Sequence, residues 1–233
     1  MGSITDRWGG SMSEVVTLGD CTLIHGDCRE VLPTLPKHDL LLTDPPYGID
    51  VGAMGMGKGK KRRAFEPFNW DIEAPPAWMF KLMISWCSDA VIWGGNYFSI
   101  EPRSGSWLAW DKVQEFSGAD FELAYTTFKT PSKIFRMARA QAYGNVERHH
   151  PTQKPLQLMA WCLGFVPDAQ TILDPFMGSG TTGVACVQLG RKFTGIERER
   201  KYFDIACERI SRAQAQGQLI PHEQPKQTQE ALI

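Results

Sequence analysis

Short apolar runs of strand length alternate with segments of helical spacing along most of this 233-residue chain. The strand-like runs are residues 22–25, 39–43, 90–93, 106–110, 121–128, 171–173 and 192–196, and helical spacing covers 75–88, 155–166, 181–189 and 199–215. Strands that alternate with helices form mostly parallel sheets, because the helices cross over between neighbouring strands. The order therefore predicts an α/β fold with a doubly wound sheet.

The length fits one domain, which we place at residues 14–216. Residues 1–13 are polar and glycine-rich, residues 217–233 are polar and glutamine-rich, and both ends are expected to be disordered. Inside the domain, residues 48–72 are rich in Gly, Lys and Arg and predict a mobile basic loop. Residues 129–149 are also basic and are expected to be irregular.

Composition limits the partners and metal sites that we expect for this chain. The net charge is −1, so a polyanionic partner must be met by a local basic patch. None of the six cysteines forms a C-x-x-C pair, which favours reduced core cysteines in a cytoplasmic protein over disulfides or zinc. The five histidines show no metal-ligand spacing, and no apolar stretch is long enough to span a membrane. We therefore expect neither a metal nor a membrane partner.

A glycine loop follows the strand-like run at 171–173 and opens the next helix. Gly178, Gly180 and Gly183 fit G-x-G-x-x-G, and Glu197 ends the following strand about 20 residues later. This arrangement suits a nicotinamide dinucleotide or S-adenosylmethionine. Asp174 lies four residues before Gly178, where a carboxylate would repel a pyrophosphate and attract a cationic amino acid moiety. The loop therefore favours S-adenosylmethionine.

Three motifs carry a resemblance to a known family. They are TDPPYGI at 43–49, HPTQKP at 150–155 and DPFMGSGTTG at 174–183. Alone, TDPPYG would fit an ordinary β-turn. Together the motifs resemble an amino-group DNA methyltransferase, and the position of DPPY before the glycine loop resembles the β group of that family. The resemblance covers roughly residues 20–212.

The resemblance implies a Rossmann-like, S-adenosylmethionine-dependent fold in permuted order. Asp27 matches the acid on the adenine side of the cofactor, and Asp44 begins the catalytic motif. All four acidic strand tips would then line the carboxyl edge of one sheet. Thr152 and Lys154 would meet the cofactor carboxylate, although a helix cap and a solvated lysine fit them too. The implied cofactor-binding residues are Asp27, Asp174, Phe176, Gly178, Ser179, Gly180, Thr181, Glu197, Thr152 and Lys154.

The DPPY motif has a chemical reading in such an enzyme. An exocyclic base amine is a weak nucleophile, so Asp44 would accept one N–H bond and then a proton. The Pro45 carbonyl would accept the second N–H, Pro46 would stiffen the turn, and Tyr47 would stack on a base flipped out of the duplex. Transfer would be a direct displacement, and the chain has no Pro-Cys dipeptide to suggest a cysteine nucleophile.

Two basic stretches are candidates for contact with double-stranded DNA. Arg and Gln side chains read guanine and adenine edges, and Lys and Arg neutralise phosphates. The sequence contains no separate large recognition domain, so we expect a homodimer. The candidate nucleic-acid contacts are Lys58, Lys60, Lys61, Arg62 and Arg63 in the first stretch, and Lys133, Arg136, Arg139 and Gln141 in the second.

The target base follows from the resemblance. Asp at the first position of DPPY leans towards adenine-N6, because related cytosine-N4 enzymes more often carry Ser there. The sequence thus predicts a bacterial or phage-encoded adenine-N6 DNA methyltransferase, orphan or part of a restriction system. Cytosine-N4 methylation is the first alternative. An RNA methyltransferase, a nicotinamide-dependent oxidoreductase and a non-catalytic DNA-binding module are the others.

Overall fold

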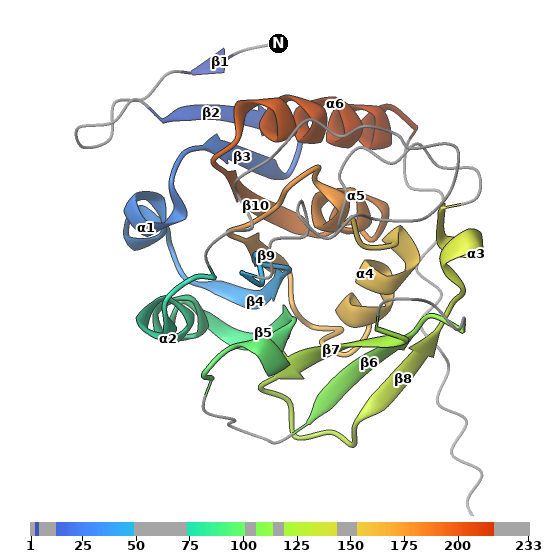
Figure 1. Cartoon of the computed structure of the whole chain (residues 1–233). Helices are drawn as coiled ribbons and strands as arrows, with labels where there is room; N and C mark the ends of the chain where they lie inside the picture. The colour runs from blue at the N-terminus through green and yellow to red at the C-terminus, as the bar shows by residue number, and fades with distance from the viewer. Residues whose placement is uncertain are drawn as a thin grey trace, which may run out of the picture.

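The computed structural model describes residues 3–4, 13–48, 74–100, 106–113, 119–143 and 153–216. The described strands form one sheet in the order β1-β2-β3-β10-β9-β4-β5-β7-β6-β8 (Figure 1). The strands are β1 (Ser3–Ile4), β2 (Glu14–Leu18), β3 (Cys21–His25), β4 (His38–Thr43), β5 (Cys87–Trp93), β6 (Trp107–Asp111), β7 (Phe121–Thr126), β8 (Lys133–Arg136), β9 (Thr171–Asp174) and β10 (Lys192–Glu197). The α-helices are α1 (Cys28–Val31), α2 (Ala77–Ser85), α3 (Arg139–Tyr143), α4 (Leu156–Leu163), α5 (Thr181–Gln188) and α6 (Arg200–Gln216).

The middle of the sheet consists of five parallel strands, β3, β10, β9, β4 and β5. Strands β9 and β10 come from the C-terminal half of the chain, yet they lie between β3 and β4 from the N-terminal half. This is the permuted arrangement that the resemblance implies. Because the five strands are parallel, their carboxyl ends lie at one edge of the sheet, where open α/β folds bind ligands.

Helices cover both faces of the sheet. Helices α1 and α2 lie on one face, and α4, α5 and α6 lie on the other (Figure 1). In β4, Leu40 and Leu42 pack in the core beneath α4, α5 and α6, whereas Leu41 packs with α1 and α2. Successive side chains of a strand point to opposite faces, so a strand covered on both sides needs a continuous apolar run. This confirms the predicted doubly wound α/β fold.

At both ends of the sheet the structure contains strands that were not predicted from the sequence. The stretch 129–149, expected to be irregular, contains β8 and α3. Strand β8 pairs with β6 at the edge of the sheet and leaves Lys133, Ile134 and Arg136 exposed, so no apolar alternation marks it. Strand β2 was not recognised, and within the expected leader Ser3–Ile4 pairs with it. The tail at 217–233 and most of the loop at 48–72 lie outside the described residues.

Candidate active site

A pocket of about 480 Å³ lies at the carboxyl edge of the parallel strands. Its lining includes the four acids that the sequence analysis placed at this edge, Asp27, Asp44, Asp174 and Glu197. Further candidate site residues also line it: Pro45, Pro46, Tyr47, Lys154, Phe176, Gly178, Ser179 and Thr181. Residues from three separate motifs therefore share one pocket, although Asp44 and Thr181 are 137 positions apart in the chain.

The glycine loop is shaped by close packing against α6. Gly180 caps the start of α5 with φ of 77°, in the left-handed region. A Cβ at this position would lie 2.9 Å from the Cβ of Ala206 on α6. Both the positive φ and this contact require glycine. Gly180 thus turns the chain from the pocket into α5, without itself lining the pocket.

Glu197, at the end of β10, holds the glycine loop through its carboxylate. It accepts hydrogen bonds from the backbone N–H of Gly178 at 2.9 Å and from that of Glu199 at 2.8 Å. Burial raises the pKa of Glu197 to about 7, although these two N–H groups offset part of the shift. Each oxygen retains a lone pair for a further donor, such as a sugar hydroxyl.

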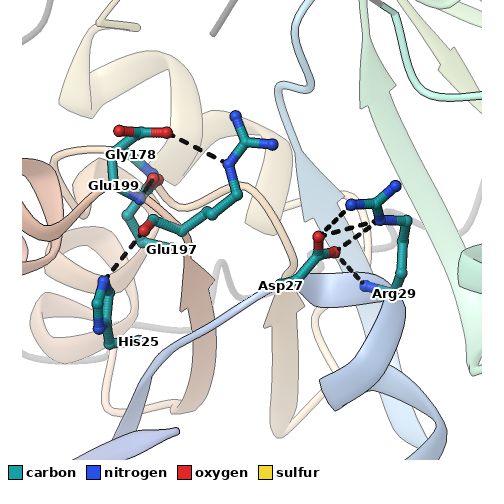
Figure 2. A network of polar contacts seen from close by, with 7 residues as sticks. His25, Asp27, Arg29, Gly178, Glu197 and Glu199 are labelled. Carbon is teal, nitrogen blue, oxygen red and sulfur yellow. Dashed lines mark hydrogen bonds and ion pairs between the residues drawn. The ribbon is translucent and has the colours of Figure 1, made fainter. Parts of the chain in front are cut away.

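Asp27 follows the neighbouring strand β3 and caps the start of α1. It accepts the backbone N–H of Arg29 at 2.9 Å and also pairs with the Arg29 guanidinium. The hydrogen bond from the Arg29 side chain lowers the pKa of Asp27, against a smaller effect of burial. Figure 2 shows the two acids at adjacent strand ends, with Asp27 facing Arg29 and Glu197 beside Gly178 and Glu199.

Asp174, at the end of β9, is held by hydroxyl groups. The hydroxyls of Thr43 and Thr182 each donate to its carboxylate at 2.7 Å, and the N–H of Phe176 donates at 3.1 Å. Burial raises the pKa of Asp174 to about 6, and the hydroxyl hydrogen bonds oppose that shift. The half-buried ring of Phe176 both lines the pocket and packs against the core beneath α1 and α2.

The catalytic motif follows β4, and both oxygens of Asp44 are engaged. The Tyr47 hydroxyl donates to Oδ1 at 2.6 Å, and the Lys154 ammonium donates to Oδ2 at 2.7 Å. From the sequence, Lys154 was expected to bind the cofactor carboxylate or to be solvated. In the structure its side chain is only 4% exposed and its Nζ contacts Asp44. Burial raises the pKa of Asp44, while Lys154 and Tyr47 oppose the rise.

The ring of Tyr47 lies against the turn that follows β5. A Cβ on Gly94, which has φ of +71°, would lie 2.1 Å from Cε1 of Tyr47. Only glycine leaves room for the ring and adopts this backbone conformation. Tyr97, three residues later, stacks on Tyr47 with ring centroids 5.0 Å apart. This turn was not predicted to belong to the site, and its available signal was the Gly94-Gly95 pair after an apolar strand.

A second partly buried carboxylate, that of Glu122, stands behind Lys154. Strand β7 runs antiparallel to β5, so its first residues lie at the carboxyl edge of the parallel strands. Glu122 Oε2 lies 3.0 Å from Lys154 Nζ, and Oε1 lies 2.8 Å from Lys112 Nζ. Burial acts to raise the pKa of Glu122, but Lys154 and Lys112 outweigh it and lower that pKa to about 2. Burial likewise disfavours the Lys154 ammonium, yet Asp44 and Glu122 hold its pKa well above the usual value.

Two further residues support the glycine loop and were not predicted. The Ser179 hydroxyl donates to Gln153 Oε1 at 3.4 Å, which joins the HPTQKP segment to the loop. Arg209 of α6 donates to the Ser179 hydroxyl at 2.9 Å and to the Thr181 hydroxyl at 3.2 Å. Burial lowers the pKa of Arg209 to about 10. An arginine within the amphipathic pattern of α6 gave no sequence signal for this contact.

The candidate DNA contacts are separate from the pocket where they are described. Lys133 and Arg136 are exposed on β8, Gln141 is exposed on α3, and Arg139 lies in α3. Arg136 pairs with Asp111 at 3.3 Å. The basic cluster in the first stretch lies outside the described residues, and so does Thr152. The residues of that cluster are Lys58, Lys60, Lys61, Arg62 and Arg63.

Within the described part of the chain, two kinds of feature are absent. None of its helices is long and apolar enough to cross a bilayer. In the same described ranges, no three or more His, Cys, Asp or Glu side chains are grouped so that they could hold a metal ion.

Comparison with known proteins gives consistent relatives. A family model described as DNA methylase, for N6 and N4 methyltransferases, matches residues 97–208. The putative methylase YubD of Escherichia coli (strain K12) is 29% identical over 218 residues, which cover 83% of this chain and 93% of that protein. The type II methyltransferase M2.MboI of Moraxella bovis is 33% identical over 111 residues, covering 46% of this chain and 41% of that protein.

Solved structures share the fold. The complex of M1.HpyAVI with SAM has a TM-score of 0.53 at 23% identity and covers 81% of this chain and 99% of that one. The cytosine-N4-specific PvuII DNA methyltransferase has a TM-score of 0.57 at 13% identity and covers 83% of this chain and 87% of that one. With its DPPY motif, glycine loop and strand-end acids in one pocket, the chain is similar to DNA methylases of the N6/N4 family.

Proposed function

We propose that this DNA methyltransferase transfers a methyl group from S-adenosylmethionine to the N6 amino group of an adenine flipped out of duplex DNA. The observation that carries the proposal is the position of Asp44. It lies in the same pocket as Asp174, Glu197 and the glycine loop, where a nucleophile and a bound cofactor would meet. The methyl donor is S-adenosylmethionine.

The cofactor side of the pocket fits a ligand that carries positive charge. Asp174 and Glu197 accept hydrogen bonds from hydroxyl and backbone N–H groups, so their negative charge is not neutralised by those partners. A sulfonium and an amino group are favourable beside such carboxylates. Glu197 has lone pairs for ribose hydroxyls, and Asp27 and Phe176 complete the expected adenine side. Ser179 and Thr181 offer hydroxyls along the loop.

The residues of the DPPY motif would activate the target amine. Its lone pair is delocalised into the base, so Asp44 accepts one N–H bond, the Pro45 carbonyl accepts the other, and density returns to nitrogen. When bound, S-adenosylmethionine supplies a methyl group whose bonding electrons stay with sulfur as the new nitrogen–carbon bond forms. Asp44 takes the proton that nitrogen then loses. Base–aromatic stacking on Tyr47, worth roughly 1–3 kcal/mol, would offset part of the unstacking energy.

Adenine is preferred to cytosine because of the first residue of the motif. Asp44 stands where related cytosine-N4 enzymes more often carry serine. The fold alone does not separate the two bases, since a cytosine-N4-specific enzyme is among the similar structures. Cytosine-N4 methylation therefore stays as the second candidate function.

Nucleoside mass spectrometry tests the proposal. The protein is incubated with S-adenosylmethionine carrying a labelled methyl group and with mixed-sequence duplex DNA, and the DNA is then digested to nucleosides. We expect label in N6-methyladenine, and none with the Asp44→Ala variant. Label in N4-methylcytosine would show that the target base is cytosine and would leave the proposed mechanism unchanged. Label only in a parallel RNA reaction would overturn the DNA substrate.

Contact with DNA through Lys133, Arg136 and Gln141 is part of the same proposal, as is a homodimer. Each phosphate contact that is lost should lower the slope of log affinity against log salt by about 1. Binding of duplex DNA by Lys133→Ala, measured over a salt series, tests the contact. Sedimentation velocity of the full chain tests the dimer.

A further inference from the structure

The catalytic carboxylate is capped in this structure. Tyr47 donates to Oδ1 of Asp44 and Lys154 donates to Oδ2, at 2.6 and 2.7 Å. An amino group that binds Asp44 must therefore share an oxygen with Tyr47 or Lys154, and the Lys154 ammonium makes that carboxylate a weaker acceptor and a weaker base. The Lys154 side chain is 4% exposed, so its ammonium cannot simply withdraw into water without leaving its packed position.

A second acceptor for that ammonium is already in place. Oε2 of Glu122 lies 3.0 Å from Nζ of Lys154. The pair lacks hydrogen-bond geometry, and this buried oxygen has no hydrogen-bond partner among the described residues. The other oxygen, Oε1, is 2.8 Å from the buried Lys112 ammonium. Glu122 is therefore anchored on one side and presents an unused acceptor on the other.

We propose that Glu122 is a positioning residue for methyl transfer, which takes over the Lys154 ammonium when the amino group of the target base binds Asp44. This inference rests on the proposed function and adds to it the device that uncovers the catalytic carboxylate. Lys112 fixes Glu122 in the place from which it can do so.

The charge balance keeps the free-energy cost of moving the Lys154 ammonium to Glu122 low. Lys112, Glu122, Lys154 and Asp44 carry two positive and two negative charges, so the group stays neutral whichever carboxylate holds Lys154. Leaving a buried ion unpaired would instead be strongly unfavourable. Without the Lys154 hydrogen bond, Asp44 is a better acceptor and a stronger base. The other titratable groups that bear on Asp44 are Tyr47, through a hydrogen bond, and Asp174, at the end of the neighbouring strand β9.

The kinetic test compares Glu122→Gln with Glu122→Asp, which keeps the charge, and with Glu208→Gln. Glu208 lies on the exposed face of α6, where it pairs with Arg212, and serves as the matched control. Single-turnover methyl transfer to duplex DNA is measured from pH 5 to 9 with saturating labelled cofactor. Cofactor affinity is measured by calorimetry on the same samples.

We expect Glu122→Gln to slow methyl transfer by roughly 10- to 100-fold, because Lys154 then stays on Asp44. Glu122 also raises the pKa of Asp44, so its neutralisation should move the acid limb of the rate profile to lower pH. Glu122→Asp should recover most of the rate, and Glu208→Gln should match the wild type. Cofactor affinity should be the same in all four proteins.

Two results would overturn the inference. One is a Glu122→Gln rate within a factor of about two of the wild type. The other is a rate loss that is equal at every pH and accompanied by weaker cofactor binding, which would indicate a structural role.

A crystal structure of Asp44→Ala tests the inference without activity. The Lys154 ammonium should there donate to Oε2 of Glu122 with hydrogen-bond geometry, and a Lys154 side chain turned elsewhere would refute the shift. If the wild type methylates no nucleic acid, the proposed function fails. The crystal structure of Asp44→Ala would still decide whether Glu122 can receive the Lys154 ammonium.

Discussion

The pocket has two halves that use the same residue type in opposite ways. On the cofactor half, the carboxylates of Asp174 and Glu197 accept hydrogen bonds from hydroxyls and backbone N–H groups. On the catalytic half, the carboxylate of Asp44 and, behind the pocket lining, that of Glu122 are paired with the ammonium groups of Lys154 and Lys112. All four lie at one end of the sheet, so the difference comes from their partners.

The pKa values of Glu197 and Glu122 reflect this difference in partners. Burial raises that of Glu197 to about 7, whereas burial of Glu122 is outweighed by Lys154 and Lys112, which lower its pKa to about 2. A half with uncompensated carboxylates favours a cationic ligand, and a half with balanced charges favours a neutral one. The contrast matches a sulfonium cofactor on one side and an uncharged base on the other.

Removal of the catalytic carboxylate should have the largest effect. Asp44→Ala should lower methyl transfer by roughly 10²- to 10⁴-fold, the usual contribution of a general base. Cofactor affinity should survive, because the cofactor half keeps its carboxylates. Radiolabel transfer and calorimetry measure the two quantities. If Asp44→Ala weakened cofactor binding as strongly as it slowed turnover, the division into halves would be wrong.

Removal of a cofactor-side carboxylate should give the opposite pattern. Glu197→Ala should weaken S-adenosylmethionine binding by about 10- to 100-fold, since hydrogen bonds to charged groups contribute roughly 1.5–3 kcal/mol. Glu208→Ala, which removes an exposed carboxylate on α6, is the control and should bind normally. Calorimetric titration decides, and equal affinity of the two variants would remove Glu197 from the cofactor site.

Cofactor affinity should depend on pH through the same carboxylate. Burial holds Glu197 protonated up to a pKa of about 7, and a cationic ligand favours the ionised form, so binding releases a proton. Affinity should therefore fall by about tenfold between pH 8 and pH 6. Calorimetry in buffers of different ionisation enthalpy measures both the affinity and the proton release. A flat profile would show that Glu197 does not meet positive charge.

The same pKa shift has a consequence for stability. The neutral acid is favoured in the folded chain, so the folded state binds more protons than the unfolded state between pH 4.5 and about 7. The contribution of Glu197 to the free energy of unfolding therefore falls as pH rises through this window. Denaturant unfolding of the wild type and Glu197→Ala at pH 5 and 8 measures this effect. The free energy of unfolding of the variant, relative to that of the wild type, should be higher at pH 8 than at pH 5.

The smallest effect is expected behind the glycine loop. Arg209→Met removes donors to Ser179 and Thr181 but keeps an unbranched side chain of similar length. Loss of one or two hydrogen bonds should weaken cofactor binding by about 3- to 10-fold and leave the single-turnover rate at saturating cofactor unchanged. A slower rate at saturation would show that α6 also shapes the catalytic half.

Much of the fold could be predicted where both faces of an element are buried. The run at 39–43 was placed within one residue of β4, because Leu40, Leu41 and Leu42 are all buried. The helix expected at 199–215 is α6, shifted by one residue. Strand β8 was missed because an edge strand with exposed side chains needs no apolar pattern, and its pairing with β6 is a tertiary contact.

The candidate site, too, could be predicted only in part from the sequence. Asp44, Asp174 and Glu197 were predicted because each stands directly after an apolar strand or within a motif of known spacing. Glu122 was not, because its role depends on β7 running antiparallel to β5. Its only signal was a charge within an apolar strand.

The sequence by itself determined the alternation of strands and helices, the acids at the strand ends and the glycine loop. These depend on local periodicity and on backbone freedom at single residues, which the order of amino acids specifies directly. Only the tertiary structure decided that β8 pairs with β6 at the edge of the sheet, and that Lys154 stands between Asp44 and Glu122. Strand order and buried charge pairs arise from contacts between segments far apart in the chain, which minimise the free energy of the whole fold and leave no local pattern.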